Sequence, residues 1–128
     1  MNGINILLVG AGGCLGCMAR YLAVVSIGKK FNSVFPYGTL TVNLLGSFLL
    51  GCIMAMVLKK TGTHHEEWRL FLATGFCGGF TTFSAFAAEN VNLFENKFPG
   101  TALAYITISV LGGLLAVWMG FAAAKNII

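Results

Sequence analysis

Residues 75–86 read GFCGGFTTFSAF, and they lie within a stretch as hydrophobic as a membrane span. The segment contains two adjacent glycines, two adjacent threonines and four phenylalanines. Glycine is unfavourable inside a helix, and threonine hydroxyls can bond back to helical carbonyls. The segment therefore predicts a transmembrane helix that is broken at Gly78-Gly79.

The rest of the chain is equally apolar. Of its 128 residues, 57% are hydrophobic and 9% are charged, with a mean hydropathy of +0.84. A soluble domain carries roughly 25% charged residues, and a domain this small could not bury so much apolar surface. The chain is therefore predicted to be an integral membrane protein. Its net charge of +4 comes from scattered basic residues and does not favour binding to nucleic acid.

Four hydrophobic segments reach the roughly 20 residues that a helix needs to cross the hydrocarbon. We expect an all-α fold with four transmembrane helices, the third of them broken, in one domain over residues 1–128. The first segment lacks a basic amino-terminal region and continues past Arg20, so it is not expected to be a cleaved signal. The segments cover residues 4–28, 37–58, 68–94 and 101–124, and short connections at 29–36, 59–67 and 95–100 join them.

The basic residues give almost no preferred orientation in the membrane. With four spans, one side carries four of them and the other side three, or four if Arg20 is counted there. Orientation depends on this difference, so we expect the chain to insert both ways up, which would permit an antiparallel homodimer. The alternative is that the bias depends on details that a count does not capture. The first set is Lys59, Lys60, Arg69 and Lys125, and the second is Lys29, Lys30 and Lys97.

All four cysteines fall inside the predicted spans: Cys14, Cys17, Cys52 and Cys77. Cys14 and Cys17 match the C-x-x-C spacing, but no second pair and no βαβ pattern accompany them. We expect these cysteines to act as small apolar packing residues rather than as a redox pair.

Polar side chains inside the spans are candidate sites, because in hydrocarbon each must find a partner or line water. Thr39, Asn43 and Ser47 are one helical turn apart and share a face. The Asn43 amide either joins helices or donates hydrogen bonds to a passing anion. Tyr105 and Ser109 have the same spacing in the fourth span and leave the same two alternatives open.

Two charged residues also lie within spans. Arg20 either extends its charged group to the membrane surface, pairs with backbone carbonyls, or attracts anions toward a vestibule. Glu89 shares a face with Phe86 and is expected near a water-filled mouth, because a carboxylate exposed to lipid would be protonated.

The predicted break frees carbonyl groups at mid-membrane, where they must be buried against protein or coordinate something. If two antiparallel copies meet there, their carbonyls surround a two-fold axis. Oxygen ligands suit a hard cation, and the lack of a nearby carboxylate favours a monovalent ion over calcium. Phe83 and Phe86 follow at helical spacing. They either pack in the core or direct their electropositive ring edges toward a small anion.

Three stretches together resemble the Fluc (CrcB) family of fluoride channels: GTLTVN at 38–43, GFCGGFTTFSAF at 75–86, and the glycine-rich first span ending in Arg20-Tyr21. The resemblance covers essentially the whole chain. It implies a passive channel, not an enzyme, that exports cytoplasmic fluoride and confers fluoride resistance. It further implies an antiparallel, dual-topology homodimer with two pores in the cell inner membrane.

The resemblance also implies a role for each matching residue. Asn43 would help hydrate fluoride, and the rings of Phe83 and Phe86 would present their edges along each pore. Gly78 and Thr81 would give backbone carbonyls to a structural Na⁺ at the dimer axis. The remaining implied positions are Tyr105, Ser109 and Ser84 in a polar track, with Arg20 and Glu89 as vestibule or structural charges.

Two positions depart from the family pattern. Ala85 stands where the family usually has threonine, and Gly113 stands where some members have serine. Each change removes a hydroxyl from or near the polar track, which affects throughput and the positions where fluoride rests.

Three other functions compete with the channel. A small drug/proton antiporter would need a carboxylate in the first span, where this chain has Arg20 instead. A membrane thiol oxidoreductase would need partner cysteines in an aqueous loop, and the loops have none. A non-conducting scaffold is disfavoured by the predicted break.

Overall fold

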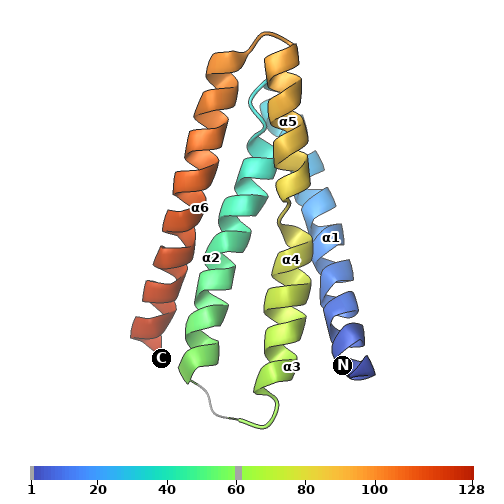
Figure 1. Cartoon of the computed structure of the whole chain (residues 1–128), viewed down its shortest axis with the longest axis vertical. Coiled ribbons are helices and arrows are strands. Elements are labelled where there is room, and N and C mark those ends of the chain that lie inside the picture. The colour runs from blue at the N-terminus through green and yellow to red at the C-terminus, as the bar shows by residue number, and fades with distance from the viewer. Residues whose placement is uncertain (1, 60–61) are drawn as a thin grey trace.

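The computed structural model describes residues 2–59 and 62–128, and all the regular secondary structure in these ranges is helical (Figure 1). Four helical spans are long and apolar enough to cross a membrane, as the hydropathy predicts. The chain is thus a multi-pass membrane protein. The spans are α1 (Gly3–Phe31), α2 (Tyr37–Lys59), a composite third span over His65–Glu95, and α6 (Pro99–Ile127).

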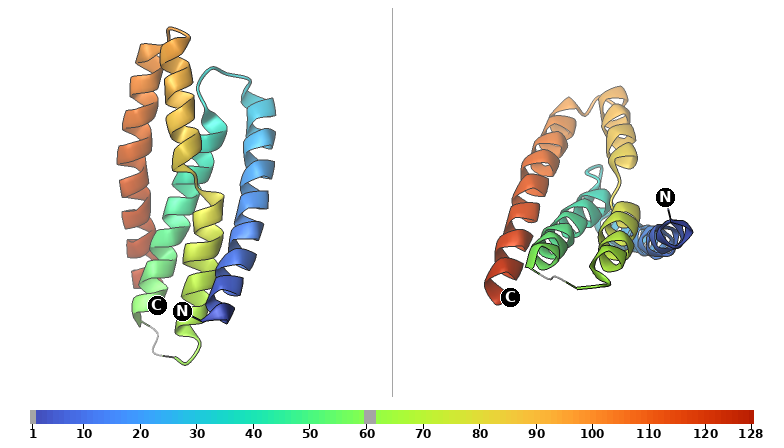
Figure 2. Two further views of the ribbon diagram at one scale, coloured as in Figure 1. Left: turned by 45° about the vertical axis from the view of Figure 1, so that its right-hand side comes forward. Right: turned by 60° about the horizontal axis from the view of Figure 1, so that its bottom comes forward.

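The spans alternate in direction, so that the end of α2 and the start of α3 lie at the same end of the bundle as the two chain ends (Figures 1 and 2). This confirms the predicted grouping of the loops, although Lys60 falls outside the described residues. At that end the Lys59 Nζ donates a hydrogen bond of 2.6 Å to the Lys125 carbonyl. Arg20 belongs to neither end of the bundle. At the helical rise per residue it lies about 16 Å along α1 from Phe31, the nearer end of that helix.

The third span is built from four helical pieces: α3 (His65–Arg69), the π-helix η1 (Leu70–Cys77), α4 (Gly78–Phe80) and α5 (Phe83–Glu95). Only Thr81 and Thr82 leave the helical region, with φ/ψ of −91°/160° and −151°/119°. The span bends by only 14°.

The predicted break of the third span at Gly78-Gly79 is therefore not confirmed, because the span continues in nearly the same direction and its local interruption lies three residues further on. Gly78 is helical, with φ/ψ of −62°/−38°, and the extended backbone begins at Thr81. Gly79 serves another purpose, since a Cβ there would overlap the backbone of Gly13 on α1. Its missing side chain lets two helices approach each other.

Glycines also form the other close contacts between spans, since small residues let the backbones of membrane helices approach closely. In α1, a Cβ on Gly12 or Gly16 would overlap main-chain atoms of the third span. In the same way, a Cβ on Gly51 of α2 would overlap the Val117 carbonyl of α6, and one on Gly120 would overlap the Phe48 carbonyl of α2. These contacts fix α1 against η1 and α4, and α6 against α2.

The cysteines are all free thiols, but they do not share one role. Cys77 is buried and Cys52 is half-buried, which fits small packing residues. Cys14 and Cys17 are exposed on the surface of α1, so the predicted packing role does not describe them within one chain.

Candidate functional site

A cleft of about 380 Å³ opens along one side of the bundle, at the level of the interruption. Its walls come from α2, the third span and α6. No charged side chain of the described residues lines it. Six of the predicted site residues do line it: Asn43, Gly78, Thr81, Phe83, Phe86 and Ser109.

The Asn43 side chain holds the interrupted backbone. Its Nδ2 donates to the Thr82 carbonyl at 3.1 Å, and its Oδ1 accepts from the Thr82 N–H at 2.8 Å. In a continuous helix that N–H would donate to the Gly78 carbonyl. An unsatisfied backbone group in hydrocarbon costs several kcal/mol, so this pair of bonds makes the interruption tolerable.

The two threonine hydroxyls have different roles. Thr81 Oγ1 donates to the Cys77 carbonyl at 2.9 Å, which is the back-bonding that the sequence predicts. Thr82 Oγ1 instead accepts from the Ala85 N–H at 3.1 Å and so caps the first turn of α5. The hydroxyls of Thr81 and Thr82 therefore satisfy backbone groups on the two sides of the interruption.

The carbonyls of Gly78 and Thr81 accept no hydrogen bond within residues 2–59 and 62–128. Both residues border the cleft. Gly78 is exposed, and the nearest atom to a Cβ there would be the Ala73 carbonyl oxygen, 4.0 Å away. Neither the backbone conformation nor packing within this chain requires glycine at position 78. The backbone of Gly78 is therefore accessible from outside the chain.

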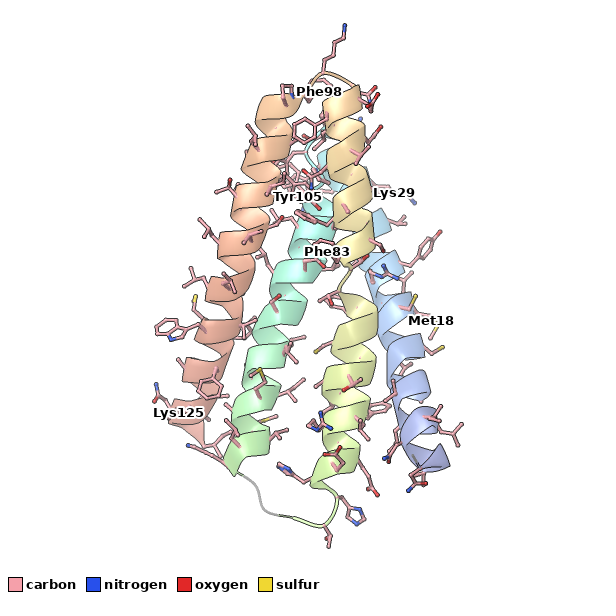
Figure 3. All side chains as sticks on the ribbon, viewed as in Figure 1. Met18, Lys29, Phe83, Phe98, Tyr105 and Lys125 are labelled. Carbon is pink, nitrogen blue, oxygen red and sulfur yellow. The ribbon has the colours of Figure 1, made fainter. Side chains whose placement is uncertain are left out.

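The two predicted phenylalanines lie at this level, with ring centroids 5.7 Å apart. Phe86 rests against Tyr105 in an edge contact with a centroid distance of 5.1 Å. Phe83 is 79% exposed and lies where the third span is interrupted (Figure 3). One ring is thus held by the bundle, while the other has little covering from its own chain.

Ser109 supplies a free hydroxyl. Its Oγ is buried on α6 and has no hydrogen-bond partner among the described residues. Gly113, one turn further along, leaves the wall open, since a Cβ there would be 4.0 Å from Ser47 Oγ. The missing hydroxyl at Gly113 therefore widens the cleft beside Ser47, whereas Ala85 contributes only its N–H to the cap of α5.

Tyr105 and Glu89 are not among the residues that line the cleft. The Tyr105 hydroxyl, on a fully buried side chain, donates to Glu89 Oε2 at 3.3 Å. Thr39 donates to Glu89 Oε1 at 2.6 Å. The carboxylate therefore joins α2, α5 and α6, a connection that sequence spacing alone could not reveal.

The structure does not bring Ser84 or Arg20 into the cleft lining either. Ser84 is exposed, with its Oγ 3.3 Å from Thr82 Oγ1. The Arg20 guanidinium donates to Cys17 Sγ at 3.4 Å, and no ion pair involves it among the described residues.

The fold and the cleft define a small four-span membrane protein with polar groups and aromatic rings gathered at mid-span. Residues 7–121 match the family model described as "CrcB-like protein, Camphor Resistance (CrcB)". The chain belongs to this CrcB family.

Its relatives have closely similar lengths, and each is named "Fluoride-specific ion channel FluC". The protein of Chlorobium chlorochromatii is 46% identical, over 94% of this chain and 92% of the relative. That of Caulobacter sp. (strain K31) is 43% identical over 96% of both chains. That of Agrobacterium fabrum is 43% identical over 97% of this chain and 98% of the relative. The named members of the family are ion channels rather than enzymes.

Replacing Asn43 with leucine tests the contact with Thr82. Asn43→Leu leaves the Thr82 N–H and carbonyl without partners, each at a cost of about 1–3 kcal/mol. We expect a lower midpoint of thermal unfolding in detergent. The control is Thr41→Val on the same helix, which removes only a local bond to the Tyr37 carbonyl. Equal midpoints for the two variants would show that the interruption does not depend on Asn43.

Proposed function

We propose that the chain forms a fluoride-selective passive channel that exports cytoplasmic fluoride and confers fluoride resistance. The observation that carries this is the composition of the cleft: hydrogen-bond donors and phenylalanine rings at mid-span, with no charged side chain of the described residues in its walls. The printed names of the relatives support the choice of ion.

A small anion that enters the cleft must exchange its water for protein donors. The Asn43 amide has two N–H groups, and one of them donates to Thr82, so the second is available. The Ser109 hydroxyl is without a partner among the described residues. The electropositive edges of Phe83 and Phe86 add attraction without a fixed charge, which lets the ion leave as well as enter.

Fluoride export through such a channel needs no energy source other than the membrane potential. Fluoride enters from acidic surroundings as neutral HF and dissociates in the neutral cytoplasm. A passive pore lets the membrane potential expel the anion, with about 2.3 kcal/mol per charge for each 100 mV.

A second copy completes each pore. The cleft is open along one side, and Phe83 at its edge is largely uncovered. An antiparallel copy placed against this face would cover Phe83 and present its own ring to the opposite cleft. Two clefts would give two pores in a dimer whose subunits insert in opposite orientations in the inner membrane.

The free carbonyls on the same face suit a structural Na⁺ between the copies. Gly78 and Thr81 are the residues that would hold it, since their carbonyl oxygens accept no hydrogen bond in the described parts of the chain. Oxygen ligands suit a hard cation, and no carboxylate of the described residues lines the cleft to favour a divalent one. The ion would offset the negative carbonyl dipoles where the two copies meet.

The decisive experiment measures ion release from liposomes that contain the purified protein. Under an imposed potential we expect rapid fluoride efflux and chloride efflux near that of protein-free liposomes. Equal efflux of the two anions would contradict the selectivity, and no fluoride efflux would contradict the function itself.

The ring edges are tested by Phe83→Ile and Phe86→Ile. Each variant keeps apolar bulk but loses the electropositive edge. We expect fluoride flux to fall about tenfold, the change produced by about 1.4 kcal/mol at the narrowest point. Dimer assembly should stay intact by size-exclusion chromatography. Phe94→Ile, on the same helix but outside the cleft lining, should conduct normally. Unchanged flux in the first two variants would refute the role of the rings.

Antiparallel pairing is tested by forcing one orientation. Three lysines added to the connection at 95–100 should keep that end on the cytoplasmic side. Such a chain should not conduct by itself. Function should return when it is co-expressed with a copy that carries the lysines in the connection at 59–67. Conduction by either biased chain alone would argue for parallel or monomeric channels.

A further inference from the structure

Gly46, one turn after Asn43 on α2, is a buried glycine that packs against side chains and not against the backbone of a neighbouring helix. A Cβ at Gly46 would overlap the Thr81 Cγ2 methyl and lie 3.2 Å from Phe80 Cδ1. At Gly51 and Gly120, by contrast, the Cβ would overlap main-chain carbonyls of a neighbouring helix. Gly46 therefore does not serve a close approach of two backbones. It forms a hollow that receives side chains of the third span.

The hollow at Gly46 receives the methyl group of Thr81, the part of that side chain that makes no hydrogen bond. The N–H of this residue donates to the Cys77 carbonyl at 3.0 Å, and its Oγ1 donates to the same carbonyl at 2.9 Å. Its methyl group fills the space at Gly46. Only its carbonyl has no partner in the described parts of the chain.

The next residue, Thr82, is held by Asn43 and caps the helix that begins with Phe83. Asn43 and Gly46 thus contact adjacent residues of the interruption from adjacent turns of α2. Movement of the Thr81 methyl would rotate the peptide that carries its carbonyl and would shift the start of α5.

We propose that Gly46 is a positioning residue, whose missing side chain sets the direction of the Thr81 carbonyl and the placement of Phe83. The expected effect of Gly46 on conduction rests on the proposed fluoride channel. The expected effect of Gly46 on the geometry of the interruption does not depend on that function.

The test is a cycle of four proteins: wild type, Gly46→Ala, Thr81→Ser, and the double variant. Gly46→Ala puts a methyl group into occupied space. We expect fluoride flux to fall about tenfold, which corresponds to about 1.4 kcal/mol of misfit. Thr81→Ser removes the methyl that the alanine would meet and keeps the hydroxyl. The double variant should therefore return to within about twofold of Thr81→Ser alone.

The midpoint of thermal unfolding, measured in sodium chloride and with sodium replaced by an organic cation, gives a readout that needs no conduction. Gly46→Ala should lower the midpoint in sodium, and the added Thr81→Ser should restore it. Gly28→Ala is the control, because its Cβ would meet no atom within 4 Å.

Wild-type liposomes that fail to release fluoride would refute the channel, and the thermal cycle would still test the hollow. If Gly46→Ala matches wild type in both readouts, or if Thr81→Ser gives no rescue, the positioning role is wrong. If Gly46→Ala does not assemble, a double variant that assembles supports the proposal, and one that also fails overturns it.

Discussion

A helix can be interrupted inside a membrane only if each freed backbone group finds a partner or a use. Here the Asn43 side chain occupies both backbone groups of Thr82. Without it, the Thr82 N–H and carbonyl would be left without partners, at a cost of about 1–3 kcal/mol each. This amide contact leaves the Gly78 carbonyl free, and the Thr82 hydroxyl, which takes the Ala85 N–H, leaves the Thr81 carbonyl free and begins α5.

Helix α2 is consequently the element on which the site is built. Along its length Thr39 bonds Glu89 of α5, Asn43 bonds Thr82, and Gly46 receives Thr81. Five residues further on, Gly51 lies against the backbone of α6. Each turn thus contacts a different part of the bundle. In hydrocarbon there is little hydrophobic force between helices, so close packing and hydrogen bonds must hold them together. The position of α2 therefore sets the width of the cleft.

Hydropathy alone was enough to find the four spans, and their ends agree with the structure to within a few residues. Six site residues that family resemblance indicated do meet in one cleft. The break expected at Gly78-Gly79 is not confirmed, because glycine propensity cannot distinguish a weak point in a helix from a close contact with another helix. Gly79 proved to be the second kind. The pairing of Glu89 with Thr39 and Tyr105 was also missed, since it depends on how three helices pack and not on spacing along any one of them.

The placement of Glu89 bears directly on how the proposed channel would choose its ion. A carboxylate in the cleft would repel an anion, and conduction requires binding that is favourable enough for the ion to enter and weak enough for it to leave. Hydrogen bonds from Thr39 and Tyr105 hold Glu89 on a face that is not part of the cleft lining, and Arg20 lies on α1 away from it. What remains along the cleft are neutral donors and ring edges. Such groups attract most strongly an anion small enough to approach them closely, because electrostatic attraction rises as distance falls. In this scheme, selectivity comes from size and hydrogen bonding rather than from charge.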